Sequence, residues 1–108
     1  MTARLASGIW VAAYLRRLQI EGIPAYVIAR GDATAGAVLV KLALMNGQAR
    51  AHMRMFDLLS GDQVWKVLIE GAEPDVDAAI TRQRGYDPDL WVIEVEDARG
   101  RDFLDDLG

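Results

Sequence analysis

The sequence predicts an α+β fold, a single domain over residues 1–108 with a mostly antiparallel sheet and two helices packed on one of its faces. Three observations support this prediction. The length suits one compact domain with an adequate core. Segments with helical and strand periodicity follow in the order α-β-β-β-β-α-β. Three central strands are joined by short turns, which is typical of antiparallel pairing. Residues 1–6 and 104–108 are expected to fray.

The first helix is expected over residues 8–21. Ser7 is a suitable N-cap. Apolar residues recur at helical spacing at Val11, Tyr14, Leu15 and Leu18. Pro24 predicts the end of the helix, because proline cannot continue it. A short strand is expected next, from Ala25 to Arg30.

The clearest local pattern is a hairpin. The segments Ala35–Met45 and Gln48–Phe56 flank Asn46-Gly47, a dipeptide that suits a two-residue type I′ turn. This turn predicts an apolar face with the pairs Val38–Met55, Val40–Met53, Leu42–Ala51 and Leu44–Ala49, and an opposite face with Leu39–Arg54, Lys41–His52 and Ala43–Arg50. A one-residue slip would bury three cationic side chains, so we expect a well-specified register.

The second half predicts a strand, a helix and a strand. Gln63–Glu70 is expected to be a strand with Trp65, Val67 and Ile69 facing inward. A second helix begins at Pro74, because proline suits the first helical position. Its apolar side consists of Val76, Ala79 and Ile80, and it is expected to stop at Gly85. Leu90–Glu96 is the last predicted strand.

The residue inventory leaves little catalytic chemistry. The absence of cysteine excludes disulfides, thiol nucleophiles and cysteine-based metal sites. Ser7 and Ser60 are the only serines and His52 is the only histidine, so a Ser–His–acid triad is not expected. The glycines follow neither the P-loop nor the dinucleotide-binding pattern. We therefore lean against an enzyme and expect no cofactor.

Charge is distributed unevenly along the chain. Residues 1–56 hold seven Lys/Arg and two Asp/Glu, whereas residues 57–108 hold five Lys/Arg and fourteen Asp/Glu. The predicted basic hairpin face, Lys41, Arg50, His52 and Arg54, is a candidate site for a phosphate ligand or nucleic acid, with Phe56 or Trp10 as a stacking surface. The net charge of -4 favours the alternative, a solvated face neutralised by the acidic half. Nucleic acid is therefore not the expected partner.

Acidic residues near the last strand allow two interpretations. Asp87, Asp89, Glu94 and Glu96 are candidate ligands for Mg²⁺ or Ca²⁺, which prefer oxygen donors, in a metal-dependent enzyme. The favoured alternative is that Glu94 and Glu96 pair with Lys41, Arg50 or Arg54 across the sheet. The acidic tail, Asp102, Asp105 and Asp106, has no explanation at this level beyond solubility.

Several apolar residues fall on the face that the prediction leaves to water. They are Leu39, Val64, Leu68, Leu90 and Val92. Exposed apolar patches mark partner surfaces more often than active sites. The leading hypothesis is therefore a non-catalytic binding or interaction domain that self-associates, with a homodimer as the commonest outcome.

The first fifteen residues contain a short apolar run after Arg4 that imitates a signal peptide. Arg16 and Arg17 end this run, and it is shorter than a membrane span. We expect a cytoplasmic protein with no membrane partner.

Three blocks of the sequence are familiar. The segments Ser7–Arg17, Gly36–Lys41 and Asp87–Asp97 resemble a bacterial family found mainly in alphaproteobacteria, the domain-of-unknown-function family 1491. The resemblance extends from about Leu5 to Phe103, with no fixed pattern over Gln48–Asp62. It implies a cytoplasmic bacterial protein, and it brings no established activity, substrate or catalytic residue.

Overall fold

The computed structural model describes residues 5–106 as one α+β domain. Its elements are α1 (Ser7–Ile20), β1 (Ala25–Ala29), β2 (Val38–Ala43), β3 (Gln48–Phe56), β4 (Gln63–Ala72), α2 (Glu73–Tyr86), β5 (Trp91–Glu96) and the 3-10 helix η1 (Leu104–Asp106). The strands form one sheet in the order β1-β5-β2-β3-β4. All neighbouring strands are antiparallel except β2 and β5, which are parallel. The predicted order of elements and the mostly antiparallel sheet are confirmed.

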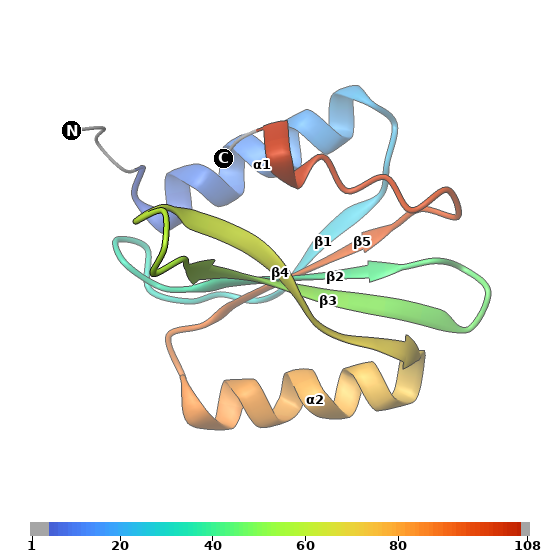
Figure 1. Ribbon diagram of the computed structural model, residues 1–108. Coiled ribbons are helices and arrows are strands. Elements are labelled where there is room, and N and C mark those ends of the chain that lie inside the picture. The colour runs from blue at the N-terminus through green and yellow to red at the C-terminus, as the bar shows by residue number, and fades with distance from the viewer. Residues whose placement is uncertain (1–4, 107–108) are drawn as a thin grey trace.

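The two helices cover opposite faces of the sheet, so the prediction that both pack on one face is wrong. Figure 1 shows α1 above the sheet and α2 below it. The chain leaves the edge strand β4, crosses the lower face as α2 and returns as β5 between β1 and β2. All six residues of β2 are buried, which is the pattern of a strand covered on both faces.

The sheet therefore separates two apolar cores. The α1 core contains Trp10, Val11, Tyr14, Leu18, Val38, Val40, Leu42, Trp91, Ile93 and Val95. The α2 core contains Leu39, Ala49, Ala51, Val76, Ile80, Leu90 and Val92. Neighbouring residues of β2 and β5 alternate between the two, as side chains of a strand must. We refer below to the α1 face and the α2 face of the sheet.

The β2–β3 register differs from the predicted one by one residue. The Leu44 N–H donates to the Gln48 carbonyl at 3.0 Å, so the loop has three residues rather than two. Two of these, Met45 and Gly47, adopt positive φ angles of 63° and 86°. Leu42 consequently pairs with Arg50 instead of Ala51. Since the side-chain period of a strand is two, this slip moves every β3 side chain to the opposite face.

A second irregularity reorients β4. Its register against β3 shifts between Ala51 and His52, which leaves Leu68 as an extra residue. Trp65 therefore packs against the α1 core and Ile69 against the α2 core. The prediction that these two side chains share an inward face is wrong, because the bulge reverses the alternation between them. Val67, also predicted inward, is 48% exposed.

The helix termini lie within one residue of the predictions: α1 ends at Ile20, and α2 begins at Glu73, just before Pro74, and passes the predicted stop at Gly85 by one residue. Ser7 is the first residue of α1 rather than its N-cap, and its buried hydroxyl donates to the Gly36 carbonyl at 2.5 Å. The buried side of α2 is the predicted one. At the C-terminal end, predicted to fray from residue 104, Leu104 is only 2% exposed. The predicted fraying of residues 1–4 and 107–108 lies outside the described part of the chain.

Candidate functional site

The four residues of the predicted basic face lie on both faces of the sheet. Arg50 pairs with Leu42 and His52 with Val40, so both belong to the α1 face, as does Arg54 two residues further along. We call these three residues the β3 row. Lys41 pairs with Ala51 on the α2 face. These four residues therefore form no single surface.

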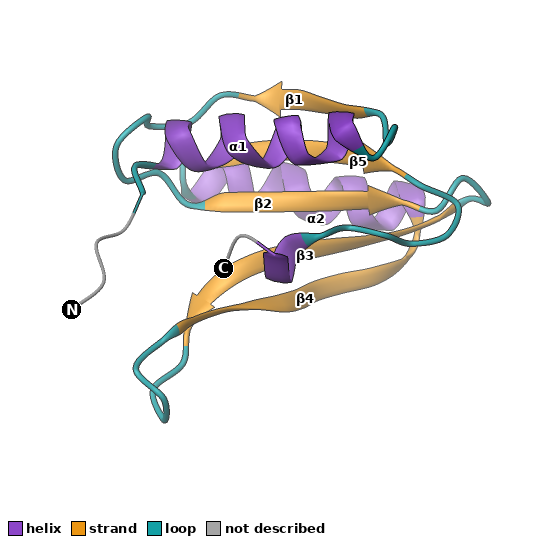
Figure 2. Ribbon diagram, turned by 90° about the horizontal axis from the view of Figure 1, so that it is seen from above, coloured by secondary structure: helices purple, strands orange, loops and turns teal. Residues whose placement is uncertain are grey.

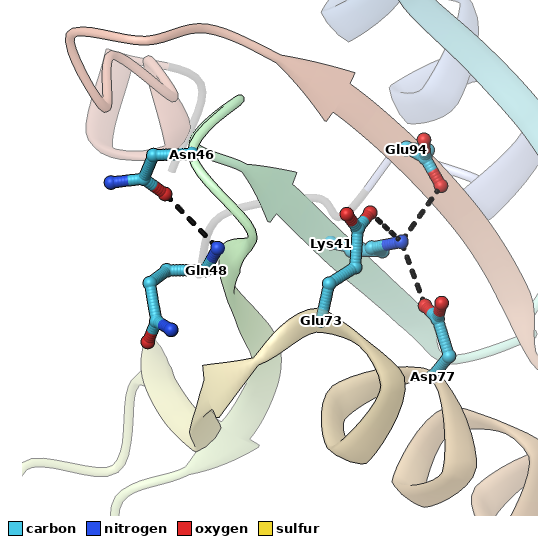
Figure 3. A network of polar contacts seen from close by, with 6 residues as sticks. All are labelled: Lys41, Asn46, Gln48, Glu73, Asp77 and Glu94. Atoms are coloured by element: carbon cyan, nitrogen blue, oxygen red, sulfur yellow. Dashed lines mark hydrogen bonds and ion pairs between the residues drawn. The ribbon is translucent and has the colours of Figure 1, made fainter.

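Lys41 is part of a charge network under α2. Its side chain is 5% exposed, and its Nζ lies 2.7 Å from both Glu73 Oε2 and Asp77 Oδ1 and 3.2 Å from Glu94 Oε1 (Figure 3). Burial lowers the pKa of Lys41, but hydrogen bonds to Asp77, Glu73 and Glu94 outweigh this effect and raise it above its ordinary value of 10.5. The ammonium group ties the start of α2 to the parallel pair β2–β5. This role is structural, and it includes the Lys41–Glu94 pair expected from the sequence.

Arg50 and His52 lie beneath the C-terminal segment, which passes over β3 (Figure 2). Asp102 Oδ2 is 3.7 Å from His52 Nε2, and the Tyr14 hydroxyl donates to the Asp102 carbonyl at 2.7 Å. Burial lowers the pKa of His52 and outweighs the opposing effect of Asp102. One member of the acidic tail thus has a defined place: it lies against the row and is fastened to α1.

Arg54 forms a cluster with two tryptophans. Its guanidinium carbon lies 5.5 Å from the ring centroid of Trp10 and 5.8 Å from that of Trp65. The two indole rings are 5.3 Å apart, and Trp10 also stacks on Tyr14. Attraction between the cation and the faces of the rings restrains the guanidinium. Of the two stacking partners proposed for the basic residues, Trp10 is therefore in position, and the side chain of Phe56 lies outside the described part of the protein.

A cavity of about 450 Å³ lies beside Arg54, within the size range of small-molecule sites. Its lining consists of Leu5, Ala6, Ser7, Thr34, Ala35, Gly36, Ala37, Val38, Arg54 and Gln63. Arg54 is the only charged residue among these, and Gln63 and Thr34 add polar groups. The sequence could not indicate this site, because the slipped register is what brings Arg54 to the α1 face.

The loop before β2 forms one wall of this cavity and closes the start of α1. The N–H groups of Ser7 and Gly8 donate to Thr34 and Ala33 carbonyls at 3.2 and 2.8 Å, so the helix does not offer these two donors to a ligand. A side chain at Gly36 would place its Cβ 2.5 Å from the Asp89 carbonyl. Glycine is therefore required for the close approach of this loop to the start of β5.

The predicted apolar interaction patch is largely the α2 core. Leu39 and Leu90 are fully buried and Val92 is 1% exposed, because α2 covers the face that was expected to be wet. Leu68 packs against the same core, and Val64 is half-buried on the edge strand β4. Leu39, Leu90 and Val92 are therefore not available to a partner, and these residues do not form an exposed apolar patch.

Exposed apolar residues gather instead on β1. Tyr26, Val27 and Ile28 are 50%, 39% and 57% exposed on a strand that pairs only with β5. A groove of about 550 Å³ between β1 and α1 adjoins it and is lined by Ala12, Leu15, Arg16, Gln19, Ile23, Pro24, Ala25 and Tyr26. We call Tyr26, Val27 and Ile28 with this groove the β1 edge.

The candidate metal ligands do not gather into a site. Glu94 pairs with Lys41, while the Asp87 carboxylate accepts the Asp89 N–H at 3.0 Å within a turn. Glu96 accepts a hydrogen bond from Tyr26, which raises the pKa of that phenol. Within residues 5–106, no group of three or more His, Asp or Glu side chains is arranged to hold a metal ion.

Comparison with known proteins places this fold in a family. The family model described as "Protein of unknown function (DUF1491)" matches residues 5–105. The chain belongs to the DUF1491 family. This confirms the resemblance carried by the three sequence blocks, which meet where the loop before β2 packs against the starts of α1 and β5. The comparison with curated proteins finds no match.

Solved structures share the fold of this DUF1491 protein. A crystal structure of a DUF1491 family protein from Caulobacter crescentus CB15 is 42% identical with a TM-score of 0.83, covering 93% of this chain and 92% of that chain. An NMR structure of a DUF1491 family protein from the same organism is also 42% identical with a TM-score of 0.83, covering 95% of this chain and 94% of that chain. A solution structure of a protein from A. tumefaciens is 27% identical with a TM-score of 0.74, covering 87% and 86%. In the described part of the present chain, neither helix is long and apolar enough to cross a bilayer.

Proposed function

We propose that this DUF1491 protein is a non-catalytic interaction domain of the cytoplasm that forms a homodimer through the β1 edge. The observation that carries the proposal is the uncharged, apolar and exposed surface of that strand. β1 contains no charged residue, and three of its five side chains are exposed and apolar. An edge strand of this kind presents unpaired backbone groups to another strand.

The opposite edge of the sheet supports the proposal by contrast. β4 carries the exposed charges Lys66 and Glu70 and a bulge at Leu68, which are devices that prevent edge-to-edge pairing. β1 has a register shift at Ile28 but none of the charges. Both edges therefore contain a register shift, and the difference between them is that only β4 carries exposed charges.

A second copy of the chain is the occupant that the β1 edge fits best. Two β1 strands related by a two-fold axis pair antiparallel, and each then presents the same apolar residues to the other. The groove between β1 and α1 extends the contact toward the helix, which a five-residue strand requires to reach the area of a stable interface. Nucleic acid is disfavoured as a partner, because Lys41 lies on the other face and the C-terminal segment covers part of the β3 row.

Sedimentation velocity over a wide range of concentration tests this proposal. The expected result is a species of twice the 11.9 kDa chain mass for the wild type. Ile28→Lys should give a monomer, because it places a charge on the paired edge. Val67→Lys is the matched control on the exposed part of β4 and should leave the dimer intact. A monomeric wild type, or a dimer unaffected by Ile28→Lys, would contradict the proposal.

A further inference from the structure

Buried polar atoms without partners are concentrated on one face of this protein. Among the described residues, the buried side-chain nitrogens that lack a hydrogen bond are Trp10 Nε1, Arg50 Nε, His52 Nε2 and Trp65 Nε1. Two belong to the β3 row, and the tryptophans lie under the third member of that row, Arg54. Buried polar groups are normally paired, so such a concentration calls for a functional explanation. Both indole nitrogens and the arginine Nε are donors, which require an acceptor.

The third tryptophan shows that the α1 core pairs an indole where structure alone requires it. Trp91 is also buried in this core, and its Nε1 donates to the Asp32 carbonyl at 2.8 Å. Arg30 lies 5.4 Å from its ring centroid, so Trp91 also has an arginine over its face. Among the three tryptophans, only Trp10 and Trp65 have indole N–H groups without an acceptor in the described part of the protein.

Arg54 connects these donors to the cavity at the start of α1. Its side chain lies over both indole rings and also lines the cavity. The described lining contains no carboxylate, so nothing in it opposes a negative charge. A guanidinium has five N–H donors in a plane and binds carboxylate or phosphate with two parallel hydrogen bonds. Positive charge and accessible volume therefore coincide at Arg54. Neither indole is itself part of the described lining, so Arg54 is the group that joins the cavity to the two rings beneath it.

We propose that this cavity binds a small molecule through an anionic oxygen group, a carboxylate or a phosphate. Arg54 holds the anion, with the indole N–H groups of Trp10 and Trp65 as neighbouring donors. Leu5 and Val38 in the lining contact the apolar remainder of the ligand. The site lies on the α1 face and is independent of the β1 edge, so either proposal can fail without the other.

The three indole N–H resonances of the folded protein provide the test. The full chain is titrated with inorganic phosphate and, separately, with acetate at constant ionic strength, and each spectrum is recorded by proton–nitrogen correlation NMR. The indole signals of Trp10 and Trp65 should shift with saturation, while that of Trp91, already bonded to Asp32, should stay in place. The anion that saturates at the lower concentration identifies the ligand class.

Matched variants separate binding from a general effect of salt. Arg54→Gln should weaken the anion at least about tenfold, since a charge-assisted hydrogen bond is lost. Arg30→Gln removes the other guanidinium that lies over a tryptophan and should leave the affinity unchanged. Trp65→Phe keeps an aromatic ring and removes the N–H, and it provides a second test if the Arg54 variant fails to fold; it should weaken the anion severalfold. No saturable shift with either anion, shifts of all three indoles alike, or an affinity unaffected by Arg54→Gln would overturn the proposal.

Discussion

The two faces of the sheet hold their charged residues in different ways. On the α2 face, Lys41 is surrounded by three carboxylates within hydrogen-bonding distance, and the network fastens a helix to the sheet. On the α1 face, the β3 row has buried nitrogen atoms without partners, a cavity beside Arg54 and a C-terminal segment lying over Arg50 and His52. Lys41 has three carboxylate partners and serves stability, whereas the indole N–H groups of Trp10 and Trp65 have no acceptor in the described part of the protein. The α1 face is therefore where binding is to be sought.

Substituting one buried leucine on each face of the sheet by alanine tests whether both faces are closed into apolar cores. Leu39 and Leu42 lie on the same strand, are both fully buried and point to opposite faces. Each substitution by alanine should lower the free energy of unfolding by about 2–5 kcal/mol. Urea denaturation of the two variants and the wild type measures both losses in the free energy of unfolding. A cost for Leu39→Ala well below that for Leu42→Ala would mean that α2 does not close its face.

Removal of Lys41 tests whether the network under α2 is structural. Lys41→Met should destabilise the fold by about 2–4 kcal/mol, because three carboxylates then face one another without a cation. Lys66→Met, at the exposed lysine of β4, is the control and should change stability by less than about 0.5 kcal/mol. An equal effect of the two substitutions would show that the network adds nothing.

The pKa of Lys41 also predicts a pH dependence. Because the folded pKa is raised above 10.5, the network stabilises the protein fully below pH 10.5, and this contribution is lost as the pH rises through the folded value. Wild type should therefore lose stability in alkali faster than Lys41→Met in urea denaturation. Parallel loss in both proteins would contradict the proposed charge state.

The smallest expected effect concerns His52, the only histidine of the chain. Burial lowers the folded pKa of His52 below 6.5, and the positive charge of Arg50 lowers it further. The nearby acids Asp102, Glu70 and Asp105 raise this pKa, but their effect is outweighed. The contribution of neutral His52 to the free energy of unfolding is therefore complete above pH 6.5. It falls as the pH decreases, because the unfolded chain binds the proton more tightly than the folded chain does. Urea denaturation at about pH 8 and about pH 5 should show that His52→Gln loses less stability than wild type on acidification. A greater loss in the variant would indicate that the pair with Asp102 dominates instead.

Much of the fold follows from local patterns in the sequence. The spacing of apolar residues determines both helices, and the prediction that α2 buries Val76, Ala79 and Ile80 is confirmed. Alternation and turn residues determine the five strands to within a few residues at their ends. The pairing of Lys41 with Glu94 was also among the expected pairs, because opposite charges on adjacent strands attract. These features depend on contacts between near neighbours or on simple charge complementarity.

Only the tertiary structure determined which side chains lie on which face of the sheet. Asn46-Gly47 predicts a two-residue turn, but Met45 also takes a positive φ, and the extra loop residue exchanges the two sides of β3. The bulge at Leu68 and the passage of α2 beneath the sheet are equally invisible in local periodicity, since both depend on strands distant in sequence. The sequence by itself determined which segments are strands and helices. Packing determined which charged side chains meet, because a one-residue change in register moves every side chain to the other face.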